Sequence, residues 1–291
     1  MDVAQICGAE LTAAHALTNI RDAMAAMSYD ARWELVGGDI HKFQQELCRK
    51  SEEQLAELLK PYASSAIHVK QEILIGSPFA EIIHSVQEHG HDLVVVGTRG
   101  ANGLQRLILG STTQRLLRNC PCAVWSVQSE PSTPLKTILA ATDFSEVSGR
   151  ALQAAAYLAQ RSGATLHVVH VVEGLDPVTL TGVPDELLRH SKREINRAAR
   201  QRLAEFAQQW AGDMPTDQRR VVWGKSWKAI GDLARRLQAD LAVLGTVGRS
   251  GIPGMLLGNT SEKVLHTIRC DVLTVKPEGF VSPIPTAIRI S

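Results

Sequence analysis

The chain has 291 residues, a length that predicts about two domains of ordinary size. Hydrophobic residues make up 44% and charged residues 21%, as in ordinary globular proteins. A net charge of +1 and only 4% aromatic residues argue against a nucleic-acid-binding or anionic-lipid-binding protein. No apolar run approaches the roughly 20 residues of a membrane-spanning helix.

The N-terminus and the cysteines predict a cytoplasmic protein. Met1 is not followed by a basic segment and an apolar run, so no secretory signal is expected. Cys120 and Cys122 are too close for a relaxed structural disulfide and have no partners for a zinc site. We expect reduced, buried thiols in a reducing compartment. The five cysteines are Cys7, Cys48, Cys120, Cys122 and Cys270.

Strands and helices alternate along the whole chain. Apolar runs bounded by turn residues predict strands, and apolar residues at helical spacing predict helices. A polar segment with two prolines, residues 128–134, reads as a linker. Before it we expect a strand within 8–17, a helix over 40–59, a strand over 67–74, a helix over 77–87 and a strand over 93–96. After it we expect strands over 137–143, 165–172, 219–223, 241–244 and 272–275, and helices over 146–161, 185–210, 226–237 and 260–268.

This alternation predicts an α/β fold with an open parallel sheet and helices on both of its faces. The continuously apolar strands agree with burial on both sides. Ligands of such sheets bind beyond the carboxyl ends of the strands, where the strand order reverses. Asp143 and Gly245 both lie at those ends, so they can share one site.

One segment occurs twice. Residues 92–103 read Asp-Leu-Val-Val-Val-Gly-Thr-Arg-Gly-Ala-Asn-Gly, and residues 240–251 read Asp-Leu-Ala-Val-Leu-Gly-Thr-Val-Gly-Arg-Ser-Gly, 148 residues later with no gap. The chain is therefore a duplication. We expect a first domain over 1–130, a second over 135–277, and a C-terminal tail over 278–291.

The first repeat is short at its N-terminal side. The second repeat uses residues 136–162 for a strand and a helix before Gly163, whereas only seven residues precede the equivalent Gly8. The first repeat thus has no counterpart of the strand over 137–143. Either the true start lies upstream of Met1 or the sheet is incomplete. We favour the first, because losing an interior strand exposes unpaired backbone.

Each repeat has the same glycine spacing after its apolar strand. Two glycines separated by two residues are followed, after nine intervening residues, by a third glycine and a polar residue. Glycine permits positive φ and lets N–H groups approach a phosphate, and the third glycine opens a helix whose free N–H groups favour an anion. These residues are Gly97, Gly100, Gly110, Ser111 and Thr112, and then Gly245, Gly248, Gly258, Asn259 and Thr260.

Two interpretations of this loop stay open: a phosphate cradle, or only a long strand-to-helix crossover. The chain has no GxxxxGK[ST] motif, and the turn after residue 143 lacks GxGxxG. A P-loop NTPase and a nicotinamide dehydrogenase are therefore disfavoured. No nucleophile–base–orienter constellation lies near the loop, so any turnover should be slow.

With these motifs the chain resembles a tandem universal stress protein of the bacterial two-domain type. The resemblance implies a Rossmann-like fold of the adenine-nucleotide α-hydrolase kind in each repeat. Nucleotide-binding members of the family carry G-x2-G-x9-G-[ST] after the fourth strand. They also carry an Asp at the end of the first strand that contacts adenine.

Carried over position by position, the resemblance implies two unequal sites. In the second repeat, Asp143 takes the adenine contact and Val171 lies beside the base, while Asn259 replaces the expected Ser or Thr. Arg249, inside the loop, is a further phosphate candidate. The other loop residues there are Leu244, Gly245, Gly248, Gly258 and Thr260. In the first repeat, Val96, Gly97, Gly100, Gly110, Ser111 and Thr112 complete the loop without an adenine-contacting Asp. We predict the site in the second repeat.

The resemblance implies a stress-response protein that binds ATP or another adenine nucleotide, with Mg²⁺ accompanying it, as a sensor or switch. A scaffold or interaction module without nucleotide is the alternative, and a slow ATPase is a third. The family dimerises through its last strands. Residues 123–127 and 272–275 are therefore expected to pair in an intrachain pseudo-dimer, with a homodimer also open. We expect no nucleic-acid or membrane partner.

Other polar residues have ordinary interpretations. His84, His89 and His91 fit no common ligand set and read as a solvated turn, so no metal site is expected. His170 reads as a satisfied core histidine rather than an acid or base. Lys225 and Lys228 read as surface lysines rather than phosphate contacts.

Overall fold

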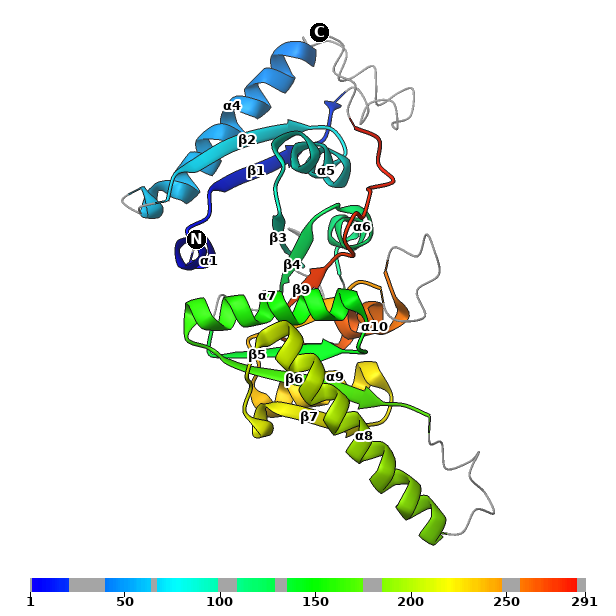
Figure 1. Cartoon of the computed structure of the whole chain (residues 1–291). Coiled ribbons are helices and arrows are strands. Elements are labelled where there is room, and N and C mark those ends of the chain that lie inside the picture. Colours follow the sequence, from blue (N-terminus) through cyan, green and yellow to red (C-terminus); the bar gives the residue numbers. More distant parts are fainter. Residues whose placement is uncertain are drawn as a thin grey trace, which may run out of the picture. The chain divides into compact units, whose positions relative to one another are not determined.

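The computed structural model describes residues 2–20, 40–63, 67–98, 109–128, 135–174, 185–247 and 257–286. The chain forms two compact units, shown in Figure 1. The first comprises residues 1–91 and 283–291, and the second comprises residues 92–282. No helix of the described residues is both long and apolar enough to cross a bilayer.

The first unit contains a two-stranded parallel sheet, in which β1 pairs with β2 from Leu11 opposite Val69 to Leu17 opposite Ile75. Helices α4 and α5 each contact both strands. Among the described residues of this unit few apolar side chains are buried, and they include Leu74, Ile83 and Val86. The elements are α1 (Asp2–Cys7), β1 (Leu11–Leu17), α4 (Ile40–Leu59), a 3₁₀ turn (Lys60–Tyr62), β2 (Val69–Ile75) and α5 (Pro78–His89).

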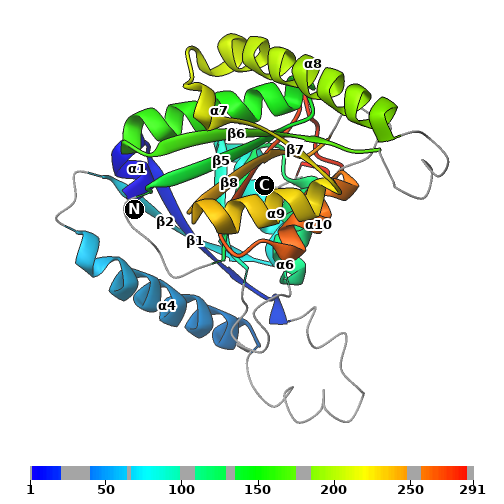
Figure 2. The same ribbon diagram turned by 90° about the horizontal axis from the view of Figure 1, so that it is seen from below.

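The second unit contains a seven-stranded sheet of order β3-β4-β9-β8-β5-β6-β7. Figure 2 shows α7 and α8 on one face of this sheet and α9 and α10 on the other. The elements are β3 (Leu93–Gly97), α6 (Ser111–Asn119), β4 (Ala123–Val127), β5 (Thr137–Thr142), α7 (Glu146–Ser162), β6 (Thr165–Val172), α8 (Asp185–Ala211), a 3₁₀ turn (Thr216–Gln218), β7 (Arg219–Trp223), α9 (Ser226–Leu237), β8 (Leu241–Gly245), α10 (Asn259–Thr267) and β9 (Asp271–Val275).

The central strands of this sheet are mostly buried. Ile138 and Leu139 of β5, and Leu241 and Val243 of β8, have no exposed surface. Such strands are hydrogen-bonded on both edges and covered on both faces, which explains their continuously apolar sequences. Helix α7 follows β5, and its first turn is capped by Ser145, whose side chain accepts a hydrogen bond from the Ser148 amide.

The predicted parallel α/β architecture is confirmed, and so is the predicted pairing of the two last strands. All neighbours in the seven-stranded sheet are parallel except β4 and β9, which pair antiparallel with Trp125 opposite Leu273. The Ser126 hydroxyl donates to the Val272 carbonyl, and the Thr274 hydroxyl donates to the Val124 carbonyl. This reciprocal pattern joins the two repeats around a local two-fold relation.

The strands of the first repeat are divided between two sheets. β1 and β2 form one sheet, whereas β3 and β4 belong to the other. In the second repeat the corresponding pairs, β6–β7 and β8–β9, lie on either side of β5 in a single sheet. No described strand takes the place of β5 in the first repeat. The compact units therefore divide the chain near residue 91, inside the first repeat, rather than at the linker.

The burial of the cysteines agrees only in part with the prediction of reduced, buried thiols. All five lie in described segments and none forms a disulfide. Cys120 and Cys270 are buried, but Cys7, Cys48 and Cys122 are partly exposed, so the expectation of buried thiols is wrong for these three. Cys7 and Cys48 lie on α1 and α4 of the first unit, where few of the described apolar side chains are buried.

Candidate nucleotide site

The carboxyl ends of β8, β5 and β6 lie next to one another. Thr142 pairs with His170, and Ala140 pairs with Val243. This register brings Asp143, Val171 and Leu244 to the same edge of the sheet. Chain connections leave β5 and β8 in opposite directions along the sheet, so this edge is its switch point.

Gly245 allows the ends of β5 and β8 to meet. A Cβ atom at this position would lie 3.0 Å from Val147 Cγ1 and 3.3 Å from the Ser148 amide nitrogen. The absence of a side chain therefore lets the first turn of α7 rest against the end of β8. This glycine has a packing role independent of any ligand.

Asp143 shapes the turn between β5 and α7. Its Oδ1 atom accepts hydrogen bonds from the Ser145 amide at 3.0 Å and from the Ser145 hydroxyl at 2.5 Å. Phe144 between them has φ of 64°, a left-handed conformation that is uncommon outside glycine. The carboxylate thus stabilises a bent segment at the sheet edge.

An aromatic cluster covers the α8 side of this turn. The Phe144 ring stacks against His170 with centroids 4.1 Å apart, and the Arg202 guanidinium lies 4.6 Å from the Phe144 centroid. The His170 Nδ1 atom is 2.9 Å from the Thr142 carbonyl oxygen. This contact confirms the interpretation of His170 as a satisfied histidine.

Both glycine loops begin and end in the same hydrogen-bonded stem. The amide of Thr98 donates to Val127 O at 3.0 Å, and the amide of Thr246 donates to Val275 O at 2.9 Å. The Gly110 amide then donates to Thr98 O, and the Gly258 amide to Thr246 O, at 3.2 and 2.6 Å. Each loop is therefore closed by backbone bonds at its base.

A hydroxyl ties each following helix to its preceding strand. Thr113 Oγ1 donates to Gly97 O at 2.9 Å, and Ser261 Oγ donates to Gly245 O at 2.7 Å. Thr113 and Ser261 were not among the predicted site residues. Their only signal in the sequence is the shared position, one residue beyond Thr112 and Thr260.

The helices after the loops begin without a side-chain cap. The cap positions of α6 and α10 are Gly110 and Gly258, which have no side chain to satisfy the first helical N–H groups. Asn259 and Thr260 at the start of α10 are exposed, as is Ser111 of α6. This arrangement fits a phosphate, which accepts hydrogen bonds from such N–H groups.

The two stems differ in the strands beside them. In the second repeat, β8 pairs with β5, and Val243 has no exposed surface. In the first repeat, β3 pairs only with β4 among the described strands, and the equivalent Val95 is 56% exposed. The structure places four of the predicted first-repeat residues in or next to the hydrogen-bonded stem: Val96, Gly97, Gly110 and Thr112. Gly100, Gly248 and Arg249 lie outside the described residues.

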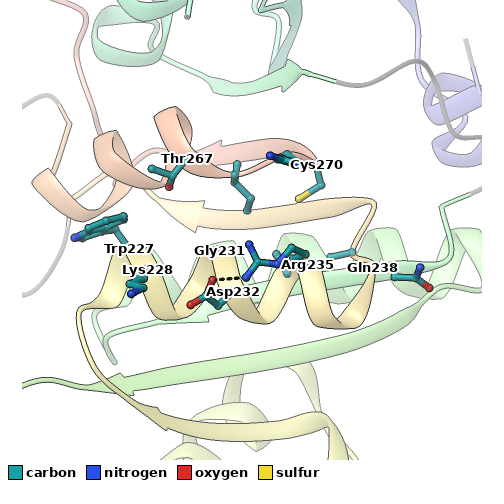
Figure 3. A pocket seen from close by; sticks show the side chains of 12 residues that line it. Trp227, Lys228, Gly231, Asp232, Arg235, Gln238, Thr267 and Cys270 are labelled. Atoms are coloured by element: carbon teal, nitrogen blue, oxygen red, sulfur yellow. Dashed lines mark hydrogen bonds and ion pairs between the residues drawn. The ribbon is translucent and has the colours of Figure 1, made fainter. Parts of the chain in front are cut away.

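Two cavities of the second unit lie away from these stems. One of about 610 Å³ lies between the start of α7 and α8, and is lined by Phe144, Glu146, Arg202, Glu205, Phe206, Gln209 and Trp210. The other, of about 480 Å³, runs along α9 and includes Trp227, Asp232 and Arg235 (Figure 3). Lys228 borders the α9 cavity, whereas Lys225 is exposed at the cap of α9.

The described residues contain no group of three or more His, Cys, Asp or Glu side chains that could hold a metal ion. The described residues include His84, His89 and His91. The His89 Nδ1 atom lies 3.1 Å from the Ser85 carbonyl oxygen, and the His89 and His91 rings are 5.7 Å apart.

Comparison with known proteins decides the family. The profile of the universal stress protein family matches residues 1–128 and residues 134–276. The chain belongs to the universal stress protein family. Two matched regions make it a tandem member, with the family boundary at the linker and not at the division between the compact units.

Curated relatives of this universal stress protein are similar over most of their length. It is 32% identical to universal stress protein E of Escherichia coli K12 over 238 residues, which covers 78% of this chain and 74% of the relative. It is 31% identical over 240 residues to universal stress protein E of Salmonella typhi, covering 79% and 75%.

Solved structures support the fold. A functionally unknown protein from Pseudomonas aeruginosa PAO1 gives a TM-score of 0.62 at 24% identity, covering 94% of this chain and 84% of that one. A universal stress protein from Archaeoglobus fulgidus gives a TM-score of 0.60 at 24% identity, covering 82% of both chains.

Proposed function

We propose that this universal stress protein binds an adenine nucleotide, ATP in the first instance, through its second repeat. Binding acts as a sensor or switch in the stress response of the cytoplasm. The observation that carries the proposal is the meeting of the β5 turn, the β8 end and the uncapped start of α10 at one switch point. The first repeat lacks the β5 part of this arrangement among its described residues.

Each part of the nucleotide has a proposed partner. Asp143 and Val171 contact the base, with Leu244 beside them. Gly245, Gly248 and Gly258 admit the phosphates, and the first N–H groups of α10 donate to them together with Asn259 and Thr260. Arg249 offers a counter-charge, and Mg²⁺ arrives with the phosphates. The free amide of Asn259 substitutes for the hydroxyl usual in the family.

Bound nucleotide is tested directly. The full chain is purified without added nucleotide and denatured, and the released small molecules are identified by chromatography and mass spectrometry. Calorimetric titration with ATP then measures affinity, with and without Mg²⁺. Released adenine nucleotide or measurable affinity is expected. Absence of both at millimolar ATP eliminates the proposal.

Matched variants locate the site. Thr260→Val removes a hydroxyl donor to a charged phosphate and should weaken ATP binding about 10-fold or more, since such hydrogen bonds contribute about 1.5–3 kcal/mol. Thr112→Val, at the equivalent position of the first repeat, should leave the affinity unchanged. The reverse pattern would move the site to the first repeat.

Asp143 needs a pair of variants, because its Oδ1 atom also holds the Ser145 turn. Asp143→Asn retains a side-chain oxygen for that turn but loses the carboxylate, whereas Asp143→Ala loses both. If the carboxylate contacts the base, both variants lose affinity, and only Asp143→Ala also loses stability. Equal ATP affinity in Asp143→Asn and the parent would remove Asp143 from the site.

A second candidate function is an interaction module without nucleotide. Asp143 and Gly245 already have structural roles, in the β5 turn and in the packing of α7 on β8. In that case calorimetry detects no ATP binding, either in the parent protein or in Thr260→Val. A homodimer would need another surface, because β4 and β9 pair within the chain.

A further inference from the structure

Two thiols meet between α6 and β4. Cys120 and Cys122 flank Pro121, and their Sγ atoms lie 3.5 Å apart. The backbone at Cys120, where α6 ends, is extended, with φ of −64° and ψ of 133°. Cys120 is completely buried, whereas Cys122 is partly exposed.

A buried ammonium group lies beside this pair. Lys276 is only 6% exposed, and its Nζ atom donates to the Leu117 and Arg118 carbonyls at 2.6 and 3.1 Å. These are carbonyls of the last turn of α6, so Lys276 caps the helix that leads into Cys120. Burial lowers the pKa of Lys276 to about 8, and the two thiols act in the opposite direction.

The contact between the sulfurs favours one shared thiolate. The hydrogen bond from Cys122 lowers the pKa of Cys120, with a further contribution from the Lys276 charge, against the opposing effect of burial. The same hydrogen bond, followed by burial, raises the pKa of Cys122. A low-pKa thiolate next to a cation is the environment of reactive cysteines.

We propose that Cys120 and Cys122 form a reversible redox site that small hydroperoxides oxidise to an intrachain disulfide. The pair shares one thiolate, which rests on Cys120, but Cys120 is completely buried and the oxidant can reach only the partly exposed Cys122. Transfer of the Cys122 proton to Cys120 across the 3.5 Å contact places the thiolate on Cys122. The Cys122 thiolate attacks the terminal peroxide oxygen and the O–O bond breaks. The alkoxide or hydroxide that leaves takes a proton from solvent, and Cys120 keeps the transferred proton. The Cys120 sulfur then attacks the resulting sulfenic acid, forming the S–S bond and releasing water.

Closing the bond requires the sulfurs to approach from 3.5 Å to about 2 Å. A disulfide between residues two apart forms a small, strained ring. Strained disulfides have higher reduction potentials and are the labile ones, so cellular thiols reverse this modification. The proposed disulfide is therefore a transient bond and not a structural one.

The second repeat supplies a control within the same chain. Ile268 stands at the position of Cys120, and Cys270 at the position of Cys122. Burial, followed by the charge of Asp271, raises the pKa of Cys270 to about 12. With Ile268 in place of a second thiol, Cys270 has no cysteine at that position to take its proton, so it should resist the oxidant.

The test uses the full-length protein and hydrogen peroxide. After treatment, remaining thiols are blocked with N-ethylmaleimide, and tryptic peptides are analysed by mass spectrometry without reduction. Cleavage after Arg118 and Lys136 leaves Cys120 and Cys122 in one peptide, and cleavage after Arg269 separates Cys270. We expect the first peptide to lose two hydrogen atoms at least about tenfold faster than Cys270 is modified, and dithiothreitol to restore it.

Single variants separate this mechanism from general oxidation. Cys120→Ser should leave a sulfenic acid on Cys122 that dimedone traps, and Cys122→Ser should make Cys120 unreactive. Cys270→Ser should not change the rate of disulfide formation. Equal oxidation of Cys270 and the pair, or sulfinic acid without any disulfide, would overturn the proposal.

Discussion

The two repeats share a glycine-loop stem but differ in the sheet that supports it. The second repeat keeps its five strands in one sheet, with β5 in the middle. The first repeat distributes its four described strands between two sheets. A central parallel strand bonds to neighbours on both edges and so joins the strand pairs on its two sides, and among the described strands of the first repeat none takes that place. A complete loop sequence therefore does not guarantee a complete site.

The largest expected difference in stability between the repeats concerns two leucines at equivalent positions. Leu241 begins β8 and is fully buried between β5 and β9, whereas Leu93 begins β3 and is partly exposed. Leu241→Ala should lower the free energy of unfolding by about 4 kcal/mol, through lost burial and a residual cavity. Leu93→Ala should lower it by less than about half of that. Urea denaturation of both variants measures the difference, and equal losses would contradict unequal support of the two stems.

A smaller effect compares the two helix caps at the β4–β9 pairing. Lys276 caps α6, whereas Gln128 at the equivalent position donates to Leu265 O of α10 at 3.3 Å. Because burial lowers the pKa of Lys276 from 10.5 to about 8, the unfolded chain holds more protons between these pH values. The free energy of unfolding should therefore rise with pH across that window, by about 3 kcal/mol relative to Lys276→Gln.

This pH series is measured with Cys120 and Cys122 both replaced by Ser, so that thiol titration does not contribute. Lys276→Gln in the same background makes the two caps alike and provides the reference. A flat difference between the two proteins from pH 8 to 10.5 would show that Lys276 is not desolvated in solution.

The smallest effect compares the hydroxyls that tie each helix to its strand. Ser261→Ala and Thr113→Val each remove one buried hydrogen bond to a backbone carbonyl. Each should cost about 1 kcal/mol, since that is the typical net value of such a bond. Similar losses in denaturation experiments would show that the stems are energetically equivalent; a much smaller loss for Thr113→Val would extend the difference between the repeats to the stem itself.

The sequence was sufficient for most of the elements and for their order. Helix α9 begins and ends where the spacing predicts, and Gly163 ends α7 in a left-handed conformation with φ of 73°. These features depend on local preferences of turn and cap residues, which are visible in a single segment. The duplication also predicted the β4–β9 pairing, once the family resemblance was added.

The division of the first repeat between two sheets could not be predicted from the sequence. Apolar periodicity indicates that β1 and β3 are strands, but it does not say which strand lies beside each. Val95 and Val243 occupy the same place in nearly the same sequence, yet only Val243 is buried. The place of Lys276 at the end of α6, next to the two thiols, was also out of reach, because Lys276 lies far along the chain.

The reciprocal caps limit how this protein can be dissected. Residue 128 of the first repeat completes α10, and residue 276 of the second completes α6. A cut in the linker would leave each half without a helix cap and with its last strand unpaired along one edge, a surface prone to aggregation. Studies of isolated repeats would then report on damaged halves. The two copies of the duplicated segment therefore complete each other's last helix and last strand.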